Sequence, residues 1–183
     1  MKIVQVNDDY IDLLTKEFPN VMDSKRFHRS HTRKYIGIIF TIGKFNYYAP
    51  FSSPKSGDYN ADGTIKKNNI FSIKMTKDDS HGSKTLLGTI KFNNMIPVPM
   101  TFVEGYSIND EDDKKYKDVV KDEFECINKN QTLIIKTAKT IYNFKLHEKE
   151  NRKDSNAKQY DAILPFKEIE DFLVAKKLSW FKF

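Results

Sequence analysis

The sequence is poor in cysteine, glycine and proline, and these absences exclude several classes of protein. The single cysteine, Cys126, rules out a disulfide framework and any zinc site built from several cysteines. With 7 glycines and 6 prolines in 183 residues, the chain is neither a linker nor a fibrous repeat. No apolar run approaches the roughly 18–20 residues of a membrane span, and the N-terminus lacks the long apolar stretch of a signal peptide. We therefore expect a soluble, cytoplasmic protein with no membrane association and one domain over residues 1–183.

Motifs for metals and for bound nucleotides are also missing. The glycines are isolated, so no glycine-rich phosphate loop is present. His81 and His147 stand alone, and the acidic run at 110–113 is better explained as the start of a helix than as a cation site. We expect no cofactor and no metal, which disfavours metal-dependent hydrolysis.

Positive charge is concentrated in one part of the chain. The net charge is +6, and residues 24–57 contain no Asp or Glu. That stretch holds seven cations and seven aromatic residues: Lys25, Arg26, Arg29, Arg33, Lys34, Lys44 and Lys55, with Phe27, Tyr35, Phe40, Phe45, Tyr47, Tyr48 and Phe51. Cations that bind phosphates and rings that stack bases favour a surface for single-stranded nucleic acid. Composition equally allows half of the aromatics to fill a sheet core beneath a solvated cationic face.

The hydrophobic pattern predicts an α+β fold. A short strand at 2–6 precedes a helix that Asn7 caps and Pro19 ends. The glycine turn at 43–44 predicts a hairpin of strands 34–42 and 45–51. Further strands are expected at 70–75, 86–92 and 98–103, and helices at 116–127, at 131–149 and from Pro165 onward. The polar segments 52–69 and 151–158 are read as connections. We expect a strongly twisted, antiparallel, barrel-like sheet with helices packed around it.

One segment carries a family signature. Residues 47–55 read Tyr-Tyr-Ala-Pro-Phe-Ser-Ser-Pro-Lys and resemble the Ala-Pro-x-(Ser/Thr)-Ser-Pro-Lys motif of type III toxin–antitoxin toxins, the ToxN-like and AbiQ-like endoribonucleases. Blocks at 33–39, 87–99 and 116–127 resemble other parts of the family in the same order. The long C-terminal part favours the AbiQ branch.

The resemblance implies both a fold and an activity. The fold would be a barrel-like core related to the MazF and Kid toxins. The activity would be metal-independent cleavage of RNA at adenine-rich sites, which leaves 2′,3′-cyclic phosphate ends. The implied partner is a small repeat-derived RNA antitoxin, a pseudoknot that the toxin processes and that holds it in a closed toxin–RNA assembly. Cellular and phage RNAs would be the substrates, and the system would stop phage infection by abortive infection.

The resemblance also assigns catalytic roles to four residues. Ser53 matches the family's key serine and Ser52 the hydroxyl residue before it; both would hydrogen-bond the scissile phosphate or position the 2′-hydroxyl. Lys55 and Arg33 would stabilise the charge of the transition state. Arg33 keeps its proton, because its pKa exceeds about 12, and is therefore a poor proton donor. Without the family blocks, an ordinary turn after a strand would explain the same serines.

Other residues are predicted to contact RNA. Lys34 and Arg29 are proposed as phosphate contacts from their charge and neighbourhood. Tyr47 and Tyr48 point to opposite faces of a strand, so one should be core and the other is free to stack a base. In the family, a lysine stands shortly before a Met-Ile-Pro segment, which is residues 95–97 here. Asn93 is nearest to that position in alignment, and Lys91 stands two residues earlier.

The histidines of the basic stretch offer a further alternative. His28 and His31 titrate near neutral pH, and such a pair suits general acid–base catalysis. Both lie outside the family blocks, and contact with RNA is the better assignment for His31.

Two rival functions remain open at this point. A non-catalytic RNA-binding barrel would use the same surface, bind with steep salt dependence and cleave nothing. A MazF-like ribonuclease would share the chemistry but be neutralised by a protein. Tandem repeats upstream of the gene would favour an RNA antitoxin, and a small acidic reading frame would favour the protein.

Overall fold

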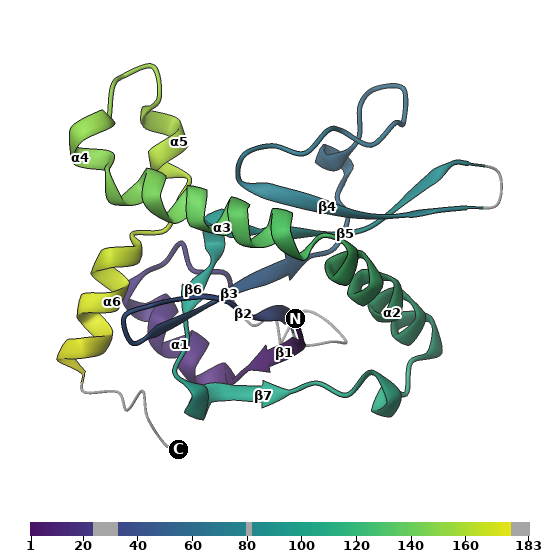
Figure 1. The fold of residues 1–183 in the computed structure, drawn as a ribbon, viewed down its shortest axis with the longest axis horizontal. Helices are drawn as coiled ribbons and strands as arrows, with labels where there is room; N and C mark the ends of the chain where they lie inside the picture. Colours follow the sequence, from purple (N-terminus) through teal and green to yellow (C-terminus); the bar gives the residue numbers. More distant parts are fainter. Residues whose placement is uncertain (24–32, 80–81, 177–183) are drawn as a thin grey trace.

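The computed structural model describes residues 1–23, 33–79 and 82–176, and their strands form one antiparallel sheet (Figure 1). The strands are β1 (Ile3–Val6), β2 (Lys34–Ile42), β3 (Phe45–Ser52), β4 (Ser72–Asp78), β5 (Lys84–Lys91), β6 (Ile96–Pro97) and β7 (Val103–Gly105). Their order is β4-β5-β3-β2-β1-β7, and β6 pairs with β3. The hairpin of β2 and β3 turns at Gly43, whose φ of 56° suits glycine. The predicted fold class is confirmed.

The α-helices are α1 (Asp8–Glu17), α2 (Lys114–Lys129), α3 (Gln131–Leu146), α4 (Glu148–Asn151), α5 (Ala157–Asp161) and α6 (Phe166–Ala175). The first two begin at a side-chain cap. The side chain of Asn7 accepts a hydrogen bond from the backbone N–H of Asp9, and Asp113 caps α2 in the same way. None of the helices in the described ranges has the length and apolar character needed to cross a membrane.

Strand β3 is the central element of the sheet. It pairs with β2 along one edge. On the other edge its first half pairs with β6, Tyr47 opposite Pro97, and its last two residues pair with β5, Ser52 opposite Thr89. Ser52 therefore lies where the chain leaves the middle of the sheet beside the β4–β5 hairpin, which extends away from the body of the protein (Figure 1).

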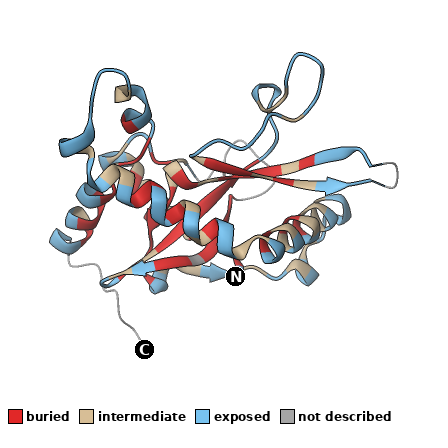
Figure 2. Cartoon of the chain, turned by 45° about the horizontal axis from the view of Figure 1, so that its top comes forward, coloured by how far each residue is buried: buried red, intermediate tan, exposed pale blue. Residues whose placement is uncertain are grey.

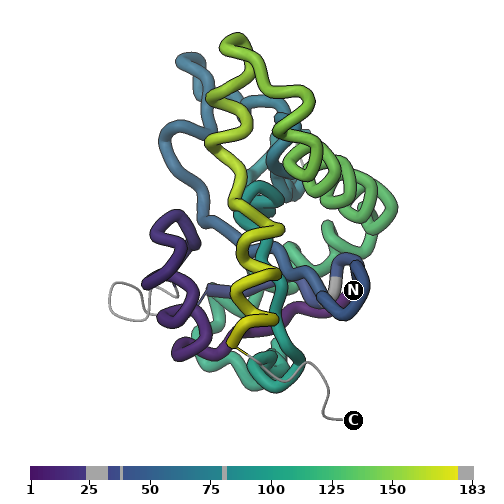
Figure 3. The backbone as a smooth tube through the Cα atoms, turned by 90° about the vertical axis from the view of Figure 1, so that its left-hand side faces the viewer, coloured from purple at the N-terminus to yellow at the C-terminus, as the bar shows by residue number. Residues whose placement is uncertain are grey.

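The core is built around aromatic side chains on β3 and the helices that cover it. Tyr47 stacks on Phe40, meets Tyr142 and Phe166 edge to face, and donates a 2.7 Å hydrogen bond to Glu170. Figure 2 shows this buried interior between the sheet and α3. Figure 3 shows α6 between α1 and α3. Helix α6 packs against α3, and its Phe172 ring meets Phe18, at the end of α1, edge to face.

Three segments differ from the sequence prediction. Residues 98–103 are not a strand: a 3-10 turn at Met100–Phe102 separates the short strands β6 and β7. Pro97 and Pro99 lack the N–H groups that a longer strand would need. Residues 151–158 are not wholly a connection, because they contain the start of α5. The predicted helix 131–149 ends at Leu146, and the short α4 follows.

Candidate active site

Arg33 is held against the end of β3. Tyr35 pairs with Pro50, so the residues before β2 lie beside the residues that end β3. The Arg33 side chain is buried, and its Nη1 donates a 2.7 Å hydrogen bond to the carbonyl oxygen of Phe51. Its Nε donates to the carbonyl oxygen of Asp23 at 2.9 Å. A permanently charged guanidinium group is therefore fixed against the residue that precedes Ser52.

The serine corner, which we define as residues 52–55, is fixed by the short helix that follows it. The backbone N–H of Lys55 donates to Asp58 Oδ2 at 2.9 Å, and the N–H of Asp58 donates to the carbonyl oxygen of Lys55 at 2.9 Å. Ser52 is buried at the strand end, whereas Ser53 and Lys55 are exposed. The corner thus presents one buried hydroxyl group, one exposed hydroxyl group and an ammonium group.

One face of the sheet carries polar side chains next to this corner. Ser52 is opposite Thr89, Thr89 is opposite Lys74, and Lys91 is opposite Ser72. Directly opposed residues in an antiparallel sheet share a face, and so do residues two apart in one strand. The side chains of all five therefore project from the same face of β3, β5 and β4.

A pocket of about 280 Å³ opens at the corner. We call it the corner pocket, and its lining residues are Met22, Ser52, Lys55, Asn69, Phe71, Ser72, Lys91, Asn93 and Asn94. Four of them are predicted site residues, namely Ser52, Lys55, Lys91 and Asn93. The structure thus brings together side chains that are far apart in the sequence, in a cavity lined largely by hydroxyl, amide and ammonium groups.

Lys91 has the most unusual electrostatic environment in the corner pocket. Its side chain is half-buried, and this burial lowers the pKa of its ammonium group. Asp58 opposes the shift, while the positive charges of Lys74 and Lys55 add to it. Lys55 and Lys91 line the corner pocket, and the nearby charge of Lys74 acts on Lys91, an arrangement that favours an anionic ligand.

Lys34 does not join this site. Successive side chains of an extended chain point to opposite faces, so the Lys34 side chain lies on the other face of the sheet from Arg33. Lys34 is buried, with Nζ 3.9 Å from the centre of the Tyr106 ring. The predicted phosphate contact is corrected here: this environment favours a structural role.

Neither tyrosine of the motif is available to RNA. Tyr47 and Tyr48 are 0% and 1% exposed. Tyr47 is covered by α3 and α6, and the Tyr48 hydroxyl lies 3.3 Å from Met100 Sδ on the other side. Because β3 is covered on both faces, the expectation that one of the pair stacks a base is corrected: both are core residues.

The remaining predicted contacts divide into two groups. Arg29, His31 and His28 lie outside the described residues. Asn93 lines the corner pocket, and its amide donates a 2.8 Å hydrogen bond to the carbonyl oxygen of Ala162. This bond ties the corner pocket to the segment between α5 and α6.

Two residues of the site region were missed from the sequence. Thr89 is 1% exposed, and within the described part of the chain its hydroxyl group has no hydrogen-bond partner. Glu123, on α2, lies behind β5: a Cβ added at Gly88 would be 2.6 Å from Glu123 Oε1. Burial raises the pKa of Glu123 to about 8. Both lie within segments that resemble the family, but no role is attached to either there, so only the strand register and the helix packing reveal them.

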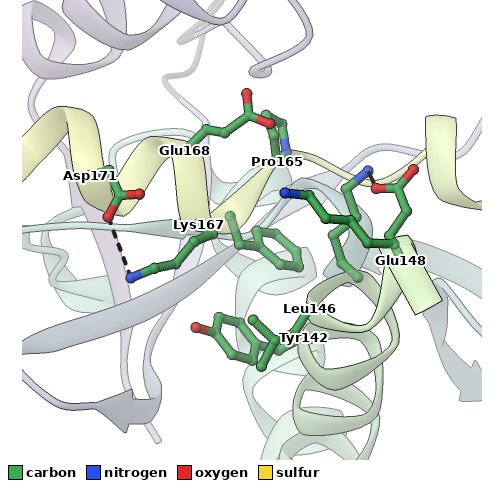
Figure 4. A pocket seen from close by; sticks show the side chains of 10 residues that line it. Tyr142, Leu146, Glu148, Pro165, Lys167, Glu168 and Asp171 are labelled. Atoms are coloured by element: carbon green, nitrogen blue, oxygen red, sulfur yellow. Dashed lines mark ion pairs between the residues drawn. The ribbon is translucent and has the colours of Figure 1, made fainter. Parts of the chain in front are cut away.

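A second pocket, of about 370 Å³, lies between α3 and α6 (Figure 4). Tyr142, Leu146 and Pro165 contribute to its lining, but no predicted site residue does. Two of its lysines are paired with acids, Lys145 with Glu148 and Lys167 with Asp171; the second ion pair is drawn in Figure 4. This neutralised rim is a poor site for a polyanion. The part of the chain that the structure describes holds no group of three or more His, Cys, Asp or Glu side chains suited to a metal ion.

Comparison with known proteins gives a consistent result. A family model described as toxin ToxN of the type III toxin–antitoxin system matches residues 2–173. Comparison with curated protein sequences gives no match.

Three solved structures align along nearly the whole chain. A type III toxin that is selectively inhibited by a non-coding RNA pseudoknot has a TM-score of 0.79 at 20% identity and covers 97% of this chain and 98% of its own. AbiQ, a lactococcal anti-phage endoribonuclease of a type III system, gives 0.73 at 20%, with 97% and 98% covered. A chain from a bacterial antiviral system regulated by a processed non-coding RNA gives 0.72 at 21%, with 93% and 96% covered. These identities establish a shared fold, and the AbiQ branch stays a prediction.

Proposed function

The chain belongs to the ToxN family of type III toxin–antitoxin toxins, and from this premise we propose that it is a metal-independent endoribonuclease toxin. In the proposed reaction the substrate's 2′-hydroxyl attacks the adjacent phosphodiester and the 5′-oxygen leaves. The products carry 2′,3′-cyclic phosphate and 5′-hydroxyl ends. Because RNA supplies the nucleophile, the protein has to align it, neutralise the phosphate and manage two protons.

The observation that carries this proposal is the position of Arg33. Its guanidinium group is anchored to the Phe51 carbonyl, directly before Ser52, and Lys55 lines the corner pocket with Ser52. These three residues and Ser53 belong to the blocks that resemble the family. Residues separated by about twenty positions are thereby assembled into one polar corner.

The four residues divide the work between hydroxyl groups and charges. Ser53 is exposed and positioned to donate a hydrogen bond to a phosphate oxygen. Ser52, buried at the end of β3, hydrogen-bonds the phosphate or positions the 2′-hydroxyl. Lys55 and Arg33 stabilise the negative charge that accumulates on the phosphate. Donors fixed in place before reaction are typically worth about 3 kcal/mol each in transition-state stabilisation.

The proposed partner is a small RNA antitoxin. A related toxin is inhibited by a non-coding RNA pseudoknot, and the likeness in fold supports the same kind of inhibitor here. We propose a repeat-derived pseudoknot that the toxin processes and that closes with it into a toxin–RNA assembly. Release from this RNA would expose cellular and phage RNAs to cleavage and abort a phage infection. The proposed location is the cytoplasm, where those RNAs are found.

The test is cleavage of RNA by the purified protein in EDTA, with analysis of the fragment ends. We expect 2′,3′-cyclic phosphate and 5′-hydroxyl ends, and no cleavage of DNA of the same sequence. Fragments with 5′-phosphates that form only with added magnesium would contradict the proposal. RNA binding without cleavage would favour the non-catalytic barrel.

The inhibitor needs a separate test. Tandem repeats of a few tens of nucleotides upstream of the gene, expressed as RNA, should suppress both growth arrest and cleavage. Suppression by a small acidic protein encoded there would instead assign the toxin to a MazF-like system.

A further inference from the structure

The proposed reaction needs a proton for the departing 5′-oxygen, and few groups at the corner can supply one. The serine hydroxyls and asparagine amides that line the corner pocket hold their protons too tightly at neutral pH. Arg33 stays protonated, since a guanidinium pKa exceeds about 12. Two ammonium groups remain in the lining, those of Lys55 and Lys91.

The surroundings of these two lysines differ. Lys55 is exposed, whereas Lys91 is half-buried at the end of β5. Burial, together with the charges of Lys74 and Lys55, lowers the pKa of Lys91, and Asp58 limits the shift. A lysine whose pKa is moved toward the working pH transfers protons more readily than a solvated one.

The geometry directs this ammonium group to the reaction centre. Lys91 follows Thr89 by two residues on β5, and Thr89 is opposite Ser52. Lys91 and Ser52 therefore project from the same face of the sheet and line the same pocket. A phosphodiester held by the serine corner would have Lys91 on the side of β5 and Arg33 on the side of β2.

We propose that Lys91 is the general acid that protonates the leaving 5′-oxygen, an inference that rests on the proposed function. The 2′-oxygen loses its proton to a solvent base and forms a bond to phosphorus. The bond between phosphorus and the 5′-oxygen breaks, and that oxygen takes a proton from Lys91 Nζ. The neutral amine then regains a proton from water, so the step needs no other reactant.

Glu123 is another buried group with a shifted pKa near the corner, and it does not compete for this role. It lies on α2 against Gly88, on the opposite face of β5 from Lys91. The sheet separates its carboxyl group from the corner pocket.

The test uses two RNA substrates and the variant Lys91→Arg. One substrate is ordinary RNA; the other has sulfur in place of the scissile 5′-oxygen and needs no proton on its leaving group. Arginine keeps the positive charge but does not release its proton. We expect Lys91→Arg to cut ordinary RNA roughly 100-fold more slowly than the wild type and the sulfur substrate at a near wild-type rate. Both rates come from one preparation, so their ratio does not depend on the fraction of folded protein.

Lys74→Arg serves as the matched control, because it keeps the positive charge that acts on Lys91. Any loss in this variant should be equal on the two substrates. The wild-type rate on ordinary RNA should rise with pH and level off above the pKa of Lys91, because loss of the ammonium group then offsets the easier deprotonation of the 2′-hydroxyl; the rate of Lys91→Arg should keep rising.

Two results would overturn the inference: wild-type cleavage of ordinary RNA by Lys91→Arg, or an equal defect on both substrates. Failure of the wild-type protein to cut either substrate would instead overturn the proposed function itself. If the wild type cuts RNA and leaves cyclic phosphate ends, the proposed function stands, and the comparison of the two substrates tests the role of Lys91 alone.

Discussion

Arg33 Nη1 lies 2.7 Å from the carbonyl oxygen of Phe51 and donates a hydrogen bond to it. The bond joins the start of β2 to the end of β3. It places a permanent cation beside the serine corner without exposing that cation to solvent, since Arg33 is 5% exposed. Arg33 therefore contributes to the fold and to the electrostatics of the candidate site together.

Arg33 should be sensitive to any substitution. Arg33→Ala removes a buried charged donor to the Phe51 and Asp23 carbonyl oxygens, at a cost of about 2 kcal/mol in the free energy of unfolding. Arg33→Lys should retain part of the cleavage rate, because a charge remains. Urea unfolding and RNA cleavage measure the two effects, with Lys139→Ala on the exposed face of α3 as control. Equal activity of Arg33→Ala and the wild type would remove Arg33 from the site.

Ser53 should be essential for cleavage but not for folding. Its side chain is exposed, so Ser53→Ala should leave the unfolding free energy within about 0.5 kcal/mol of the wild type. RNA cleavage and growth arrest on expression should both be lost. Ser56→Ala, a nearby exposed serine in the first turn after the corner, is the matched control and should remain active. An active, folded Ser53→Ala protein would exclude the proposed role.

Gly88 should tolerate a side chain poorly while Glu123 is present. A Cβ there would lie 2.6 Å from Glu123 Oε1 and 3.3 Å from the carbonyl oxygen of Ser52. We expect Gly88→Ala to cost about 2 kcal/mol, as overpacked positions do. In a double-mutant cycle with Glu123→Ala, part of this cost should disappear because the closest atom is gone. Strict additivity of the two changes would show that the glycine and the carboxyl group do not interact.

Glu123 should make stability fall with pH. Its pKa of about 8 lies above the value near 4.3 expected in an unfolded chain, so burial favours the neutral acid. The stability present below about pH 4 is therefore lost progressively as the pH rises toward 8. Glu123→Gln, which is neutral at every pH, should be increasingly more stable than the wild type from pH 5 to pH 8. The gain should reach a few kcal/mol, because each pKa unit corresponds to about 1.4 kcal/mol. A constant difference between the two proteins in urea unfolding would contradict the buried, neutral state.

Lys34 should not matter for RNA. Its ammonium group lies under the Tyr106 ring on the far face of the sheet. Lys34→Met should keep cleavage and RNA affinity within about twofold of the wild type, and stability within about 1 kcal/mol. Filter binding at two salt concentrations gives the affinity and its salt dependence. A clear loss of RNA affinity in a folded Lys34→Met protein would return this residue to the RNA surface.

Local chemistry made parts of the fold predictable. A glycine turn between two apolar runs determines the β2–β3 hairpin, and Asn7 and Asp113 determine where α1 and α2 begin. The prolines around residue 98 had the opposite effect. Residues 98–103 are predicted as one strand, but because Pro97 and Pro99 lack N–H groups the chain makes two short strands and a turn.

The sequence alone determined the residue types of the candidate site, because hydroxyl groups, cations and a family motif are properties of neighbouring residues. Only the tertiary structure decided which of them meet. Alternation along a strand makes Arg33 and Lys34 equal candidates, and the face that packs against the helices buries Lys34 away from the corner. Likewise, Lys91 and Ser52 share a pocket because of the pairing of β5 with β3, a long-range register that no local pattern specifies.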